Sequence, residues 1–134
     1  MREFRVPISP GELLDKLTIL RIKVERIADP SKLANVQREL AGLEAIWRKE
    51  LGAEVDISED ERALARVNGA LWESEDALRE LETAQRFDAE FVALARSVYQ
   101  RNDERAAIKR RVNSKLGSEL IEEKSYRTTA GPRT

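Results

Sequence analysis

Apolar residues recur at intervals of three and four along the first third of the chain, the spacing that places side chains on one face of an α-helix. One run consists of Leu13, Leu17, Leu20, Val24 and Ile27, and a second of Leu33, Val36, Leu40, Leu43 and Trp47. The sequences SPGE (residues 9–12) and ADP (residues 28–30) predict the two helix starts, because each places a capping side chain directly before a proline. The short connection between the runs predicts an antiparallel helical hairpin.

The second half of the chain predicts another hairpin. SEDE (residues 58–61) predicts a capping box at the start of the third helix, Asp88 predicts the cap of the fourth, and Gly117 predicts its left-handed end. We therefore expect an all-α fold, an antiparallel four-helix domain of two helical hairpins with short extended N- and C-terminal segments. Residues 1–126 are expected to form this single helical domain, and residues 127–134 a disordered tail.

The fourth helix departs from the apolar pattern. Counted in steps of three and four from Phe91, its seam contains three consecutive polar residues, Asn102, Arg105 and Lys109. Because an unpaired charge is costly to bury in a helix seam, these residues should be paired either within the protein or by a ligand. The remaining alternative is a slightly rotated buried face that consists of Leu94, Val98, Arg101 and Ile108.

Two polar stripes are expected to face each other across the second hairpin. If the chain reverses near residue 85, Trp72 lies opposite Tyr99 and Glu75 lies opposite Arg96. The stripes consist of Asn68, Trp72, Glu75 and Arg79 on the third helix and of Tyr99, Asn102, Arg105 and Lys109 on the fourth, with Asp76 and Asp103 beside them. Residues 54–82 contain ten acidic and three basic side chains, whereas residues 96–116 contain seven basic and two acidic ones, so ion pairs can hold the two helices in register.

Two interpretations of these stripes remain open. If they only fix the packing, Glu75 and Asp103 should pair with Arg96, Arg105 or Lys109. If they bind a ligand, Arg105 and Lys109 suit a carboxylate or phosphate, and the nearby acids suit Mg²⁺. Glu73 and Asp76 match one acidic pair of the all-α nucleoside triphosphate pyrophosphohydrolases, but the preceding helix supplies no matching pair.

Composition narrows the chemistry further. The chain contains neither cysteine nor histidine, which excludes disulfides, thiolate metal sites and the histidine-based triads and zinc sites. The net charge of −1 gives no reason to expect nucleic acid or an anionic membrane as a partner. The N-terminal ten residues contain no long apolar run, and no apolar stretch approaches a membrane span, so we expect a cytoplasmic protein.

The chain resembles a family of short bacterial and phage proteins that share a domain of unknown function. The resemblance covers roughly residues 4–126 and depends on SPGELLDK, the LW and ED pairs of NGALWESED, VYQRNDERAAIKR, and GSELIEEKSY. It implies no activity. Members of this family are sometimes encoded near glycosyltransferases, which implies a protein partner in a surface-polysaccharide pathway. The resemblance adds six secondary candidates to the polar stripes: Asp15, Lys16, Glu122, Glu123, Lys124 and Tyr126.

The sequence therefore favours a non-enzymatic binding or accessory module whose polar seam either binds a small anion or only fixes packing. We expect this module to need no cofactor. The alternative is a Mg²⁺-assisted all-α enzyme that acts on a nucleotide or sugar nucleotide. Because the helices carry broad apolar faces for so small a domain, we also expect a homodimer.

Overall fold

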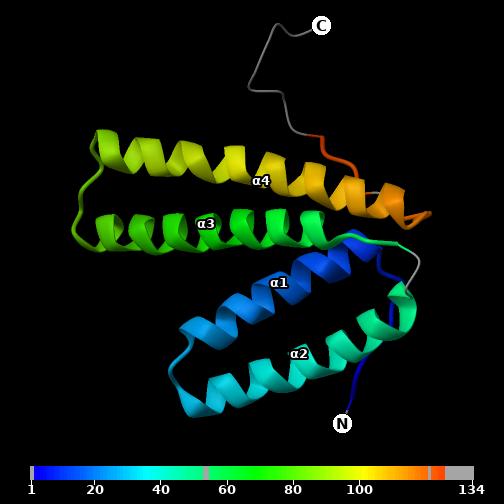
Figure 1. Cartoon of the computed structure of the whole chain (residues 1–134). Coiled ribbons are helices and arrows are strands. Elements are labelled where there is room, and N and C mark those ends of the chain that lie inside the picture. Colours follow the sequence, from blue (N-terminus) through cyan, green and yellow to red (C-terminus); the bar gives the residue numbers. More distant parts are fainter. Residues whose placement is uncertain (1, 53–54, 121, 126–134) are drawn as a thin grey trace, which may run out of the picture.

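The computed structural model describes residues 2–52, 55–120 and 122–125. These residues form four helices, α1 (Pro10–Arg26), α2 (Pro30–Leu51), α3 (Ser58–Thr83) and α4 (Ala89–Lys115). The described part of the chain contains no strand. Figure 1 shows α1 with α2 and α3 with α4 as two antiparallel hairpins, so the predicted all-α four-helix fold is confirmed. The predicted disordered tail, residues 127–134, lies outside the described residues.

Three of the four helix starts follow the sequence signals. The Ser9 hydroxyl accepts a hydrogen bond from the Glu12 amide at 3.2 Å, and the Asp29 carboxylate accepts one from the Lys32 amide at 2.9 Å. Asp88 caps α4 in the same way. Each side chain satisfies a backbone N–H that has no partner within the helix.

The start of α3 differs from the prediction. Ile57 is the N-cap and provides no side-chain hydrogen bond, whereas Ser58 already lies within the helix. The Ser58 amide instead donates to Asp56 Oδ1 at 3.0 Å. Ile57 is only 3% exposed, so burying its side chain in the core brings the helix start forward by one residue.

α1 is the central helix of the fold. It packs against α2, α3 and α4, whereas α2 packs against α1 alone among the helices (Figure 1). Because α1 has neighbours on several sides, its first three turns are buried well beyond a single stripe. The main hydrophobic core consists of Leu13, Leu14, Leu17, Trp47, Ile57, Leu64, Val67, Ile108 and Val112.

The second hairpin has the predicted register. The hydroxyls of Ser74 on α3 and Ser97 on α4 are 3.3 Å apart and hydrogen-bonded. A reversal of the chain near residue 85 is expected to place these two residues opposite each other. The same register places Trp72 opposite Tyr99. Gln85 adopts a positive φ of 57° in the turn itself.

The first turn of α1 and the last turns of α4 lie in close backbone contact. The Gly11 amide donates a 2.7 Å hydrogen bond to Asn113 Oδ1, and both residues are buried. A Cβ atom at position 11 would lie 2.5 Å from the backbone oxygen of Lys109. A side chain at this position therefore cannot fit unless the two helices move apart.

Candidate functional site

A buried polar cluster joins α1, α3 and α4. Asp15 on α1 is 1% exposed as a residue, and its two carboxylate oxygens accept hydrogen bonds from one guanidinium of α4. Arg105 Nε lies 2.8 Å from Asp15 Oδ1, and Arg105 Nη2 donates to Asp15 Oδ2. The hydrogen bond with Asp15 raises the pKa of Arg105, so the guanidinium stays charged. This two-point contact is the strongest geometry available to a carboxylate and an arginine.

Asn68 completes the cluster from α3. Its Nδ2 donates to Asp15 Oδ1 at 2.9 Å and to Thr18 Oγ1 at 2.8 Å. Thr18 in turn donates its hydroxyl hydrogen to the Asp15 carbonyl oxygen. Both partners of Nδ2 act as acceptors, so the orientation of the Asn68 amide follows from chemistry.

Lys109 links α4 to α1 and to the C-terminal segment. Its Nζ is 2.7 Å from Glu12 Oε2 and 2.7 Å from Glu122 Oε2, and Lys124 Nζ lies 2.6 Å from the other oxygen of Glu122. Burial opposes the charged ammonium, but the hydrogen bonds to Glu12 and Glu122 outweigh it and raise the pKa of Lys109. Hydrogen bonds from Lys109 and, to a smaller extent, from Lys124 lower the pKa of Glu122 to about 2.

Glu122→Gln should lower stability at neutral pH by less than about 1 kcal/mol, because the carboxylate is partly exposed and its ion pairs are screened. The pKa of Glu122 falls from 4.5 in the unfolded chain to about 2 in the fold, so its contribution is complete above pH 4.5 and is lost as the pH falls toward 2. Urea unfolding of both proteins from pH 7 to pH 2 measures this difference.

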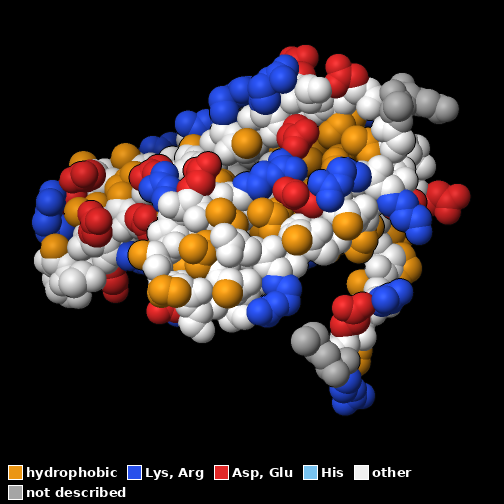
Figure 2. Space-filling view, turned by 60° about the horizontal axis from the view of Figure 1, so that its bottom comes forward, with side chains coloured by type: hydrophobic (Ala, Val, Ile, Leu, Met, Phe, Trp, Pro, Cys, Tyr) orange, Lys and Arg blue, Asp and Glu red, His pale blue; other side chains and the backbone are white. Residues whose placement is uncertain are grey.

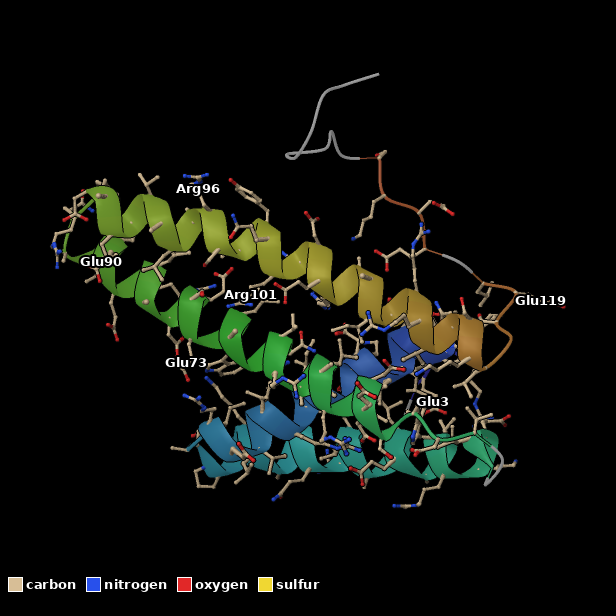
Figure 3. The ribbon with its side chains drawn as sticks, turned by 45° about the horizontal axis from the view of Figure 1, so that its top comes forward. Glu3, Glu73, Glu90, Arg96, Arg101 and Glu119 are labelled. Carbon is tan, nitrogen blue, oxygen red and sulfur yellow. The ribbon has the colours of Figure 1, made fainter. Side chains whose placement is uncertain are left out.

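Glu119→Gln is the matched control, because Glu119 is an exposed glutamate of the same segment and has no ion pair with a described residue (Figure 3). Its stability should follow that of the wild type at every pH. A gap between wild type and Glu122→Gln that stays constant from pH 7 to pH 2 would contradict the Lys109 contact.

A second buried carboxylate, Asp60 at the start of α3, holds the end of α4. Arg111 Nε lies 3.2 Å from Asp60 Oδ1, and Lys115 Nζ lies 2.6 Å from Oδ2. Burial opposes ionisation, but hydrogen bonds from Lys115 and Arg111 outweigh it and keep the pKa of Asp60 below its usual value. The basic half of α4 is therefore neutralised along its length by acids of α1, of the first turn of α3 and of the C-terminal segment.

An open pocket lies beside the buried cluster, between α1 and α3. Its volume is about 450 Å³, within the range of small-ligand sites. Ile19, Leu71 and Trp72 provide apolar surface. The charged residues of its wall are Glu75, Asp76, Arg79 and Arg105, and Asn68 also lines it. Glu75, Asp76 and Arg79 make no ion pair with any residue that the structure describes.

The predicted site residues thus separate into two groups. Asn68 and Arg105 belong to the buried cluster together with Asp15. Lys109 lies beside this cluster and pairs with Glu122, which also pairs with Lys124. Trp72, Glu75, Asp76 and Arg79 line the open pocket, which the cluster borders through Asn68 and Arg105. The others lie apart: Tyr99 and Asp103 are exposed, Lys16 is exposed on α1, Glu123 pairs with Arg110, and Tyr126 lies outside the described residues.

The packing interpretation named the wrong acids. In the described chain, neither Glu75 nor Asp103 pairs with a cation of α4. Arg96 projects from the side of α4 that faces away from α3 (Figure 3). The predicted inward face of α4 is also partly wrong, because Asn102 and the alternative residue Arg101 are both exposed. Ile108, Lys109, Val112 and Asn113 are the buried residues of α4, since α1 lies only against its C-terminal half.

The sequence did not indicate several polar residues that join the helices. Glu12, Thr18, Asp60 and Asn113 all hold helices together. A signal existed for one of them: Thr18 follows Asp15 by three residues, and both sit between leucines of the buried run. Among the described residues, no three acidic side chains lie close enough together to hold a metal ion.

Comparison with known families supports the expected domain of unknown function. The model of a family of unknown function, DUF6165, matches residues 4–133, nearly the whole chain. The chain belongs to DUF6165. The function of this family is unknown, so membership gives no activity for the buried cluster or for the pocket. Searches of curated proteins and of solved structures found no match to this DUF6165 chain. None of its described helices is long and apolar enough to cross a membrane.

Proposed function

We propose that this DUF6165 chain is a non-enzymatic binding module, and that the pocket beside Trp72 receives a positively charged group on an apolar stem. A lysine or arginine side chain of a partner has this chemistry, as does a free organic cation. The observation that carries the proposal is the excess of hydrogen-bond acceptors around an apolar pocket.

The acceptors come from three side chains. Glu75 and Asp76 are exposed carboxylates without an ion pair in the described chain. Asn68 is 5% exposed, and its Oδ1 accepts no hydrogen bond from a described residue because Nδ2 faces Asp15 and Thr18. A ligand that donates several N–H groups suits this wall better than one that accepts them.

The cations near the pocket are less available to an anion. Asp15 already occupies two N–H groups of Arg105, and Asn102 accepts from a third at 3.5 Å. Lys109 lies in a separate polar pocket, where it holds two carboxylates. Arg79 alone among the pocket's cations has no partner in the described chain. These pairings favour a cationic ligand over the small anion that the sequence left open as one alternative.

Trp72 supports the same ligand class. It is half-buried, and a tryptophan ring is the best aromatic partner for a cation. The Asp15 carboxylate next to the pocket is fully engaged by Arg105 and Asn68, so it is not placed to take a proton from a ligand. This supports binding without chemistry.

Titration with small cations is expected to shift the indole signal of Trp72 and leave that of Trp47 in place. The chain contains two tryptophans, so two indole N–H cross-peaks report on the pocket and on the core, and Trp72→Phe assigns them. Butylguanidinium and butylammonium should give saturable shifts, whereas butyrate and butanol should not. The double variant Glu75→Gln, Asp76→Asn should weaken cation binding at least about tenfold, because two charge-assisted contacts are lost.

Glu80→Gln is the matched control, because it removes one negative charge from an exposed position of α3 that does not line the pocket. Arg79→Met should strengthen cation binding by removing a like charge. The proposal fails if butyrate shifts the Trp72 signal more than the cations do, or if Glu80→Gln weakens binding as much as the double variant.

A further inference from the structure

The N-terminal segment, residues 2–8, stands away from the body of the protein. Figure 2 shows it as an arm that leaves the helices, and all seven residues are exposed. Phe4, Val6 and Ile8 are 82%, 72% and 39% exposed. In an extended chain, alternate residues lie on the same face, so these three side chains form one apolar edge.

An apolar groove begins at the root of this arm. Its volume is about 880 Å³. The residues that line it include Pro7, Ile8, Pro10, Ile46, Glu50 and Lys115. Ile46 on α2 is 50% exposed there, although it is as apolar as the core residues. The arm and the groove therefore each leave apolar surface exposed to water in a single copy of the chain.

The root of the arm directs it away from its own groove. Pro7 and Pro10 fix φ at two positions, and each disfavours a helical conformation at the residue before it in favour of an extended one. Residues 7–10 also form one edge of the groove, so the arm would have to reverse within this stiff segment to lie in it. An arm of seven residues reaches about 24 Å when extended, which is enough to cross to a neighbouring molecule.

We propose that the groove binds the N-terminal arm of a second copy of this chain, in a symmetric dimer that exchanges both arms. A single two-fold axis would then bury the apolar surfaces of both arms and both grooves. The same surfaces are used on both subunits, as in other closed homodimers. The charges also agree, because Glu50 at the groove has no ion pair with a described residue and the arm carries the cations Arg2 and Arg5. Lys115, which also lines the groove, is already paired with Asp60. The interface is separate from the pocket beside Trp72.

Site-specific cross-linking tests this exchange, because the chain has no cysteine of its own. Phe4→Cys and Ile46→Cys are introduced into separate chains, which are mixed at neutral pH and oxidised. A disulfide between the two kinds of chain is expected. Ala34→Cys is the matched control, because it is exposed on α2 but lies near the opposite end of the helix from the groove. It should not link to Phe4→Cys.

Mass measured in solution provides the second readout. The full chain should be a dimer, and the variant Phe4→Ser, Val6→Ser should raise the dissociation constant at least about tenfold while leaving the helical circular dichroism unchanged. A disulfide within one chain of the double variant Phe4→Cys, Ile46→Cys would overturn the proposal, because the arm then fills its own groove. A monomer without cross-links, or a dimer that survives the serine variant, would also overturn it.

Discussion

Arg105→Met should lower the free energy of unfolding by about 3–5 kcal/mol, because it leaves the Asp15 carboxylate buried without its cation. The Asp15 side chain of the pair is 2% exposed, so its carboxylate has little contact with water to replace the lost guanidinium. Urea unfolding at pH 7, followed by circular dichroism, measures the loss. A change below 1 kcal/mol would mean that the buried cluster does not hold the helices together.

Arg101→Met is the matched control for this prediction. It applies the same substitution on the same helix, one turn earlier, at the position labelled in Figure 3. The Arg101 pair with Glu104 is exposed on both sides, with side chains 45% and 50% accessible, so its loss should cost no more than about 1 kcal/mol.

A double variant distinguishes the effect of the unpaired Asp15 charge on stability from the effect of the lost Arg105 packing. Adding Asp15→Asn to Arg105→Met removes the unpaired carboxylate and keeps an oxygen that can accept from Asn68. We expect the double variant to be more stable than Arg105→Met alone, because an uncompensated buried charge is the main cost of the single change. If the double variant loses further stability, the shape of Asp15 and Arg105 matters more than their charge.

Gly11→Ala should be the second most damaging of these changes, with a loss of about 1–3 kcal/mol. The new methyl group would lie 2.5 Å from the backbone oxygen of Lys109 and 2.9 Å from Asn113 Oδ1. The backbone oxygen cannot rotate away as a flexible side chain can, so α1 and α4 must separate. That movement would also lengthen the nearby contact between Asp15 and Arg105. Thermal unfolding of wild type and variant measures the loss.

Gly69→Ala is the same substitution at a second glycine, and there we expect the stability to rise. Gly69 lies within α3, and a Cβ atom there would meet nothing within 4 Å. Replacing a helical glycine with alanine in open space should stabilise the protein by about 0.5–1 kcal/mol. Equal stability of the two alanine variants would mean that α1 and α4 are not in close contact at Gly11.

The helices and their order were predictable because they depend on local chemistry. The apolar repeats, the Asp29 and Asp88 caps and the two short connections all act within a few residues of one another. The register of α3 and α4 also followed, since a tight turn between long antiparallel helices leaves little freedom, as the contact between Ser74 and Ser97 confirms. The start of α3 did not follow, because burial of Ile57 in the distant core outweighs a local capping signal.

The partners of the basic residues on α4 were decided by the tertiary structure. The sequence by itself determined that Arg105 and Lys109 interrupt an apolar stripe and need partners, but its charge pattern indicated acids of the second hairpin instead of acids on α1. α1 lies between α2 and the second hairpin and brings Glu12 and Asp15 to α4, which leaves Glu75 and Asp76 to line an open pocket. Periodicity identifies the faces of a helix. Which faces meet depends on how side chains far apart in the chain fill a common core, and that arrangement exists only in three dimensions.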